Sequence, residues 1–164
     1  GLLYGMSEFG LTRQLGFTRE ESRSYIARYF QRYPGVLDYM ERTRQIAREQ
    51  GFVETILGRR LYTPDIMATN KMIKQAAERA AINAPLQGSA ADIIKLAMIA
   101  VDKVLPKDQA KLLLQVHDEL VFEADVAIAD ELSKQIAEVM QSVLEISVPF
   151  VVEVGQGLNW DAAH

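Results

Sequence analysis

The chain has 164 residues, of which 49% are apolar and 24% charged, and it contains no cysteine. These values predict one ordinary domain, or a large and a small lobe, and they exclude a disordered chain, a disulfide scaffold and a thiolate metal site. No apolar run approaches the roughly 20 residues of a membrane helix, so we expect no membrane partner.

The net charge of −4 is unevenly distributed along the chain. Residues 1–80 carry 13 Lys+Arg and 9 Asp+Glu, whereas residues 81–164 carry 5 and 13. An arginine-rich half beside an acidic half indicates one surface for phosphates and another for cations. Solvated helix faces with surface salt bridges explain the same charges, so both interpretations stay open.

The first fifty residues predict helices. A short helix lies between Gly10 and Gly16. A capping box at Thr18–Glu21 opens an amphipathic helix, and Pro34 ends it and starts the next, which runs to Gly51.

The pattern then changes to a strand at residues 52–57, a turn at Gly58 and a return strand at residues 60–62. An alanine-rich helix is predicted from about Asn70 to Val104, with Pro85 expected to kink or split it.

Residues 111–123 predict a β-hairpin of two apolar runs, and continuous apolar runs indicate that both sheet faces are covered or nearly covered. A helix at about 126–144 and a last strand at 148–154 follow. The order predicts an α+β fold with a small, mostly antiparallel sheet backed by helices.

Two adjacent acids, Asp118 and Glu119, occupy the tip of the predicted hairpin. A carboxylate held on rigid strands can bind Mg²⁺ while water and substrate phosphates supply the other ligands. Charged residues are also common in ordinary turns, and a two-metal site needs carboxylates from another element. His117, beside this pair, is a metal ligand, a phosphate contact or a spectator.

A row of polar side chains, Arg79, Asn83 and Gln87, is spaced four residues apart and shares one helix face. Their donors suit the purine N3 and pyrimidine O2 acceptors that every base pair shows in the minor groove. A polar stripe on a half-buried helix is the alternative. Tyr4 beside Gly5 offers a stacking face for a base, or simply packs in the core.

Three separated motifs together resemble those of the family A DNA polymerases. Residues 1–7 are similar to the end of motif B on the fingers helix, residues 78–92 to the palm helix that follows the primer-template duplex, and residues 115–121 to motif C. The ending 159–164 also resembles the end of such polymerases, so the similarity covers essentially the whole chain.

The resemblance implies a role for each matching residue. Asp118 binds the catalytic metals with Glu119 assisting, and His117 lies at the primer end. Tyr4 stacks where the template base or new pair sits, and Gly5 permits that approach. The residues that contact DNA are Arg79, Asn83 and Gln87 along the duplex and Arg59 and Arg60 on the template strand.

The implied reaction is template-directed DNA synthesis, in which a primer 3′-hydroxyl attacks a dNTP and two Mg²⁺ ions assist. Residues 1–66 are expected to be a remnant of the helical fingers and residues 67–164 the C-terminal part of the palm. The implied partners are primer-template DNA and dNTP, for a monomeric enzyme of the cytoplasm, associated with the nucleoid.

The second metal-binding Asp of motif A has no counterpart in the chain, which begins with Gly1. We therefore expect a fragment of a longer polymerase, with an incomplete metal site and no activity alone. Three alternatives are a non-catalytic duplex-DNA-binding module, a metal-dependent hydrolase that adds Asp92 to the two turn acids, and a purely structural helical domain.

Overall fold

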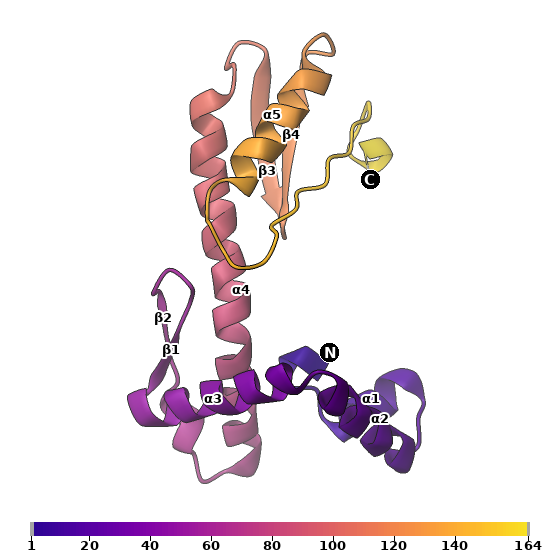
Figure 1. The fold of residues 1–164 in the computed structure, drawn as a ribbon, viewed down its shortest axis with the longest axis vertical. Coiled ribbons are helices and arrows are strands. Elements are labelled where there is room, and N and C mark those ends of the chain that lie inside the picture. Colours follow the sequence, from indigo (N-terminus) through magenta and orange to yellow (C-terminus); the bar gives the residue numbers. More distant parts are fainter. Residues whose placement is uncertain (1, 164) are drawn as a thin grey trace. The chain divides into compact units, whose positions relative to one another are not determined.

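The computed structural model describes residues 2–163 (Figure 1). Its contacts divide the chain into two compact units, the first ending at Ser89 and the second beginning at Ala90. Helices predominate, and each unit adds one two-stranded antiparallel sheet. The α+β fold class predicted from the sequence is therefore confirmed.

The first unit opens with helices whose ends follow local sequence signals. Thr18 and Glu21 form the predicted capping box, and Pro34 starts a helix that ends at a left-handed Gly51. The short helix predicted between Gly10 and Gly16 begins earlier, at Glu8, and includes Gly10. The helices are η1 (Leu2–Tyr4), α1 (Glu8–Leu15), α2 (Arg19–Arg32) and α3 (Pro34–Gln50).

A short hairpin and a turn of 3₁₀ helix follow α3. Strands β1 (Phe52–Glu54) and β2 (Arg60–Tyr62) pair antiparallel with Val53 opposite Leu61, and η2 spans Pro64–Met67. The predicted hairpin is confirmed, although its first strand is shorter than expected. Buried side chains of α3, β1, η2 and the next helix form the core of this unit: Ala47, Val53, Ile66 and Ala81.

The long helix α4 (Lys71–Val104) continues without interruption through Pro85. Pro85 therefore does not split it, contrary to one of the two outcomes predicted. By length and composition alone, a stretch of α4 with a mean hydropathy of 1.2 could cross a membrane. A single helix of this kind is weak evidence for a membrane span, because helices of water-soluble proteins pass the same test.

The second unit packs the end of α4 and a second helix against a hairpin. The hairpin pairs β3 (Ala110–Val116) with β4 (Glu119–Ala124), and α5 spans Ala129–Gln141. A short 3₁₀ helix, η3 (Asp161–Ala163), lies near the end of the chain. The buried core draws on all of these elements except η3: Ala97, Val101, Leu105, Ala110, Leu132, Ile136 and Met140.

Two expectations for the second unit are wrong. The apolar run of β3 is not covered on both faces, since Leu113 and Leu114 are 52% and 44% exposed at a register shift between Leu112 and Leu114. The predicted strand at residues 148–154, all within the described range, is irregular chain instead. Val152 packs on the core, whereas Val148 and Val151 are exposed, so side-chain packing rather than strand pairing positions this segment.

Candidate functional site

Gly5 and Arg79, two residues singled out by the sequence, lie against each other in the first unit. Gly5 has a positive φ of 76°, and a Cβ atom built on it would lie 3.2 Å from Cγ of Arg79. The amide of Gly5 donates to the carbonyl of Leu2 (2.9 Å), which closes the turn after η1. The absence of a side chain thus lets the stem of Arg79 lie across this turn, and Tyr4 in the same turn is 44% exposed.

Arg79, Asn83 and Gln87 occupy successive turns of α4, as predicted. Arg79 and Gln87 are exposed, and Asn83 is half-buried. The Oδ1 atom of Asn83 is buried and has no hydrogen-bond partner among the described residues. The guanidinium of Arg79 and the amides of Asn83 and Gln87 carry N–H donors, so the row can present N–H groups to a ligand.

Arg59 stands at the end of the β1–β2 hairpin and is tied to α4. Its Nη2 donates to the carbonyl of Gly88 (3.3 Å), and its backbone amide donates to Oγ1 of Thr55 (3.1 Å). The hairpin approaches α4 closely here, since a Cβ on Gly88 would lie only 2.6 Å from Cγ2 of Thr55. Gly88 therefore permits the contact that fixes where Arg59 lies.

Arg60 is held on the hairpin by its neighbours. Its Nε atom lies 2.8 Å from a carboxylate oxygen of Glu54, and its guanidinium lies 4.3 Å from the centre of the Phe52 ring. The hydrogen bond with Glu54 raises the pKa of Arg60 above its ordinary value, so this side chain stays charged. Half of it remains exposed, which leaves other N–H donors for a phosphate.

A hollow of about 340 Å³ brings three of the predicted DNA contacts together. Arg59 and Arg60 enter it from the hairpin, and Gln87 enters it from α4. The rest of its lining comes from the same two elements: Val53, Glu54, Thr55, Leu61, Ala84 and Gly88. Guanidinium and amide donors therefore converge on one hollow of the first unit, an arrangement that suits an anionic ligand.

The acidic turn belongs to the second unit. Val116 pairs with Glu119, so His117 and Asp118 form a two-residue turn, and His117 adopts a positive φ of 53°. Positive φ is typical of the tight turns that join antiparallel strands. The side-chain amide of Gln115 also donates to the carbonyl of His117. His117 and Asp118 are exposed and Glu119 is half-buried, so the carboxylate of Asp118 is accessible.

No group of three or more acidic or histidine side chains gathers at one place among residues 2–163. Among these residues Asp92 therefore does not form a three-carboxylate metal cluster with Asp118 and Glu119, which is the arrangement that the hydrolase alternative requires. The acidic turn offers two adjacent carboxylates from one element, which can be only part of a two-metal site.

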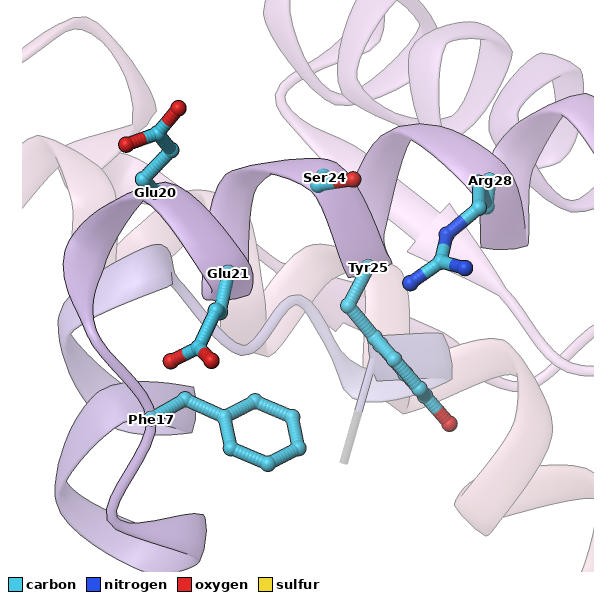
Figure 2. A pocket seen from close by; sticks show the side chains of 6 residues that line it. All are labelled: Phe17, Glu20, Glu21, Ser24, Tyr25 and Arg28. Carbon is cyan, nitrogen blue, oxygen red and sulfur yellow. The ribbon is translucent and has the colours of Figure 1, made fainter.

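A larger hollow of about 410 Å³ lies on α2 and contains none of the predicted site residues (Figure 2). Its rings, Phe17 and Tyr25, have centroids 6.1 Å apart. The other lining residues are Glu20, Glu21, Ser24 and Arg28. Two glutamates line one end of this hollow and an arginine lines the other, so its lining does not favour an anionic ligand.

Three residues that matter to the geometry were missed in the sequence. Gly88 could have been found, because a glycine inside a helical pattern often marks a close backbone approach. Thr55 and Tyr39 carried no such signal. The hydroxyl of Tyr39 donates to the carbonyl of Ile82 across 43 positions in the chain (2.8 Å), and no local pattern predicts such a bond.

Comparison with known proteins places the chain in one family. The chain belongs to DNA polymerase family A, whose sequence profile matches residues 1–162. It is 55% identical over 166 residues to DNA polymerase I of Pseudomonas aeruginosa and 48% identical over 162 residues to that of Lactococcus lactis subsp. lactis. These matches cover 100% and 98% of the chain but only 18% of each relative.

A solved structure agrees with the sequence relatives. The chain matches the POL domain of Pol1 from M. smegmatis, in complex with DNA primer-template and dNTP, with a TM-score of 0.94 and 46% identity. The match covers 99% of the chain and 29% of that structure's chain. The resemblance found in the motifs is thereby confirmed.

Proposed function

We propose that the chain is part of an enzyme that extends a DNA primer along a template by transferring nucleotides from dNTP to the primer 3′-hydroxyl. The observation that carries the proposal is the family match along residues 1–162, at 45% identity or more to several DNA polymerase I sequences. The solved relative, whose bound partners are primer-template and dNTP, supports the same substrates.

The first unit supplies contacts to the duplex. Arg79, Asn83 and Gln87 face the minor groove, where acceptors are present at every base pair, so they test base-pair geometry without reading sequence. Arg59 and Arg60, in the hollow that Gln87 also lines, hold phosphates of the template strand. Tyr4 stacks on a base at the templating position, and Gly5 keeps the turn narrow enough for that approach.

The second unit supplies the carboxylates of the reaction centre. Carboxylate oxygens are the ligands that Mg²⁺ prefers, and the accessible Asp118 fits such an ion, with Glu119 beside it. When bound, two Mg²⁺ ions lower the pKa of the attacking hydroxyl and stabilise the leaving pyrophosphate. The rigid β3–β4 pair fixes the direction of Asp118, and His117 contacts the primer end. The facing carboxylate comes from outside these 164 residues.

In this proposal residues 1–66 belong to the fingers and residues 67–164 to the palm of a monomeric polymerase. Such an enzyme works in the compartment that holds the chromosome, in association with the nucleoid. The Arg-rich first half of the sequence and its acidic second half then have separate partners, DNA phosphates and metal ions.

The experiment places this chain in a complete enzyme. In a chimera, residues 1–164 replace the matched segment of the Pseudomonas aeruginosa polymerase, and primer extension is followed with Mg²⁺. We expect extension by the chimera and a loss of about a thousandfold with Asp118→Asn, the effect of several kcal/mol of lost charge stabilisation. Asp108→Asn, at an exposed acid before β3, is the matched control and keeps full activity.

Extension at an unchanged rate by the Asp118→Asn chimera would refute the proposed role of the acidic turn. A chimera that binds primer-template with a steep salt dependence but never extends it would favour the non-catalytic duplex-binding module.

A further inference from the structure

α4 is weakest at Pro85, in the middle of the row of donors. A proline has no N–H group, so the carbonyl four residues earlier, that of Ala81, loses its helical partner. The next carbonyl, that of Ile82, accepts the hydroxyl of Tyr39 from α3 at 2.8 Å. Ala81 and Ile82 are fully buried, so this bond lies inside the first unit. It joins α3 to the turn of α4 that lacks one backbone hydrogen bond because of Pro85.

Two further braces hold α4 near the same row. Arg48 of α3 pairs with Glu78 at 2.7 Å, directly before Arg79. The hydroxyl of Ser89 donates to the carbonyl of Pro85 and accepts the amide of Ile56 from the hairpin at 2.8 Å. Each of the three donors therefore lies within two residues of a position that another element holds by a hydrogen bond or ion pair. Tyr39 holds Ile82, which directly precedes the central donor, Asn83.

The surroundings of Tyr39 keep its hydroxyl a donor. Burial raises the pKa of Tyr39 above the ordinary tyrosine value, so the hydroxyl stays protonated at neutral pH. The Thr43 hydroxyl donates to the backbone carbonyl of Tyr39 (2.7 Å) and fixes the turn of α3 from which the ring extends. Asn83 directly follows the bonded carbonyl of Ile82 and has its own Oδ1 buried, so a shift of this turn would move the Asn83 amide.

We propose that Tyr39 is a positioning residue that sets the register of Arg79, Asn83 and Gln87 against the DNA minor groove. This inference rests on the proposed function, because it assumes that the row faces DNA. Tyr39 contacts no nucleotide itself. It acts through the Ile82 carbonyl, since three donors on successive turns reach three acceptors together only if the helix between them keeps one geometry.

The test removes only the hydroxyl, with Tyr39→Phe in the full chain. Binding is measured by fluorescence anisotropy on two primer-templates, one natural and one with 3-deazapurines near the primer end, which lack the minor-groove acceptor N3. We expect the wild type to bind the 3-deaza duplex about tenfold more weakly, the scale of a lost specific contact. Tyr39→Phe should bind the natural duplex about three- to tenfold more weakly and lose little more on the 3-deaza duplex.

Two controls separate positioning from general damage. Tyr33→Phe makes the same chemical change at a tyrosine that is 52% exposed, and it should behave as the wild type. The salt dependence of Tyr39→Phe should be unchanged, because its phosphate contacts remain. Hydrogen exchange supplies a second measurement: the amides of Leu86 and Gln87 should exchange faster in Tyr39→Phe, while those of α2 keep their wild-type rates.

The outcomes distinguish the two proposals. If Tyr39→Phe still suffers the full tenfold loss on the 3-deaza duplex, the positioning role is overturned and the proposed function stands. If the wild type binds both duplexes equally, or binds neither, the row does not read the minor groove and the positioning role is overturned, whereas primer extension by the chimera still decides the proposed function.

Discussion

Replacing Gly5 with alanine should destabilise the first unit measurably. An L residue in the left-handed region costs about 1–2 kcal/mol, and Gly5 has φ 76°. The new Cβ would lie 3.2 Å from Cγ of Arg79, so the arginine stem must move by a few tenths of an ångström. The lower entropy of the unfolded alanine chain offsets about 0.4–1 kcal/mol. We expect a net loss of about 1 kcal/mol, and a melting temperature lower by roughly 2–4 °C.

Urea denaturation and thermal melting followed by circular dichroism measure this loss. Gly35→Ala is the matched control, because Gly35 lies in the first turn of α3 and no atom beyond its chain neighbours and the helix backbone lies within 4 Å of its Cβ position. This variant should gain about 0.5–1 kcal/mol. Arg79→Ala, which removes Cγ, should abolish the steric part of the Gly5→Ala penalty and leave the backbone part. If Gly5→Ala proves as stable as Gly35→Ala, the argument from backbone strain and close contact is wrong.

Three other changes test separate parts of the structure. Gly88→Ala places a Cβ 2.6 Å from Cγ2 of Thr55 and should displace the hairpin, weakening duplex binding several-fold in anisotropy measurements; adding Thr55→Ser removes that methyl group and should restore binding. Ile136→Ala opens the core of the second unit and should cost about 2–5 kcal/mol in urea denaturation. Hydrogen bonds from the Thr18 amide and hydroxyl lower the pKa of Glu21. The ionised Glu21 side chain therefore stabilises the folded state above the ordinary glutamate pKa of about 4.3, and this stabilisation is lost as the pH falls through the lowered pKa. Glu21→Gln should remove this part of the pH dependence in melts between pH 7 and pH 3.

The helices of the first unit were predictable because their ends are encoded locally. The side chains of Thr18 and Glu21 satisfy backbone groups within the same turn, and Pro34 and Gly51 act through their own backbone geometry. None of these signals needs a distant partner. The bounds of α2 and α3 therefore follow from sequence within a residue or two.

The errors concern segments whose state depends on distant partners. Residues 148–154 are rich in β-branched residues, but a strand forms only where another strand offers its backbone, and side-chain packing through Val152 positions this segment instead. Leu113 and Leu114 of β3 are likewise exposed, because coverage of a sheet face depends on which other elements pack on it and not on the strand's own sequence. Pro85 remains inside α4, where side chains from α3 and Ser89 bond to neighbouring carbonyls.

The sequence predicted the candidate site residues themselves, but not the contacts that hold them in place. The motifs identified Arg79, Asn83 and Gln87 as a row, and the structure keeps them on successive turns of one helix. The contact of Gly5 with Arg79 and the bond from Tyr39 to Ile82 join residues more than forty positions apart, so neither could be predicted from local spacing. The functional roles of the row and of the acidic turn stay predictions until the binding and extension experiments are done.

The positive φ of His117 lowers the stability of the β3–β4 turn but restricts the direction of the Asp118 side chain. Glycine at this position would relieve about 1 kcal/mol of backbone strain and, by that measure, improve the hairpin. The same change would let the turn sample more conformations, so the carboxylate of Asp118 would spend less of its time in one direction. Selection for thermal stability alone should therefore favour His117→Gly, and selection for synthesis should reject it. If His117 is kept under selection for synthesis, the turn gives up some stability and in return holds the Asp118 carboxylate in one direction.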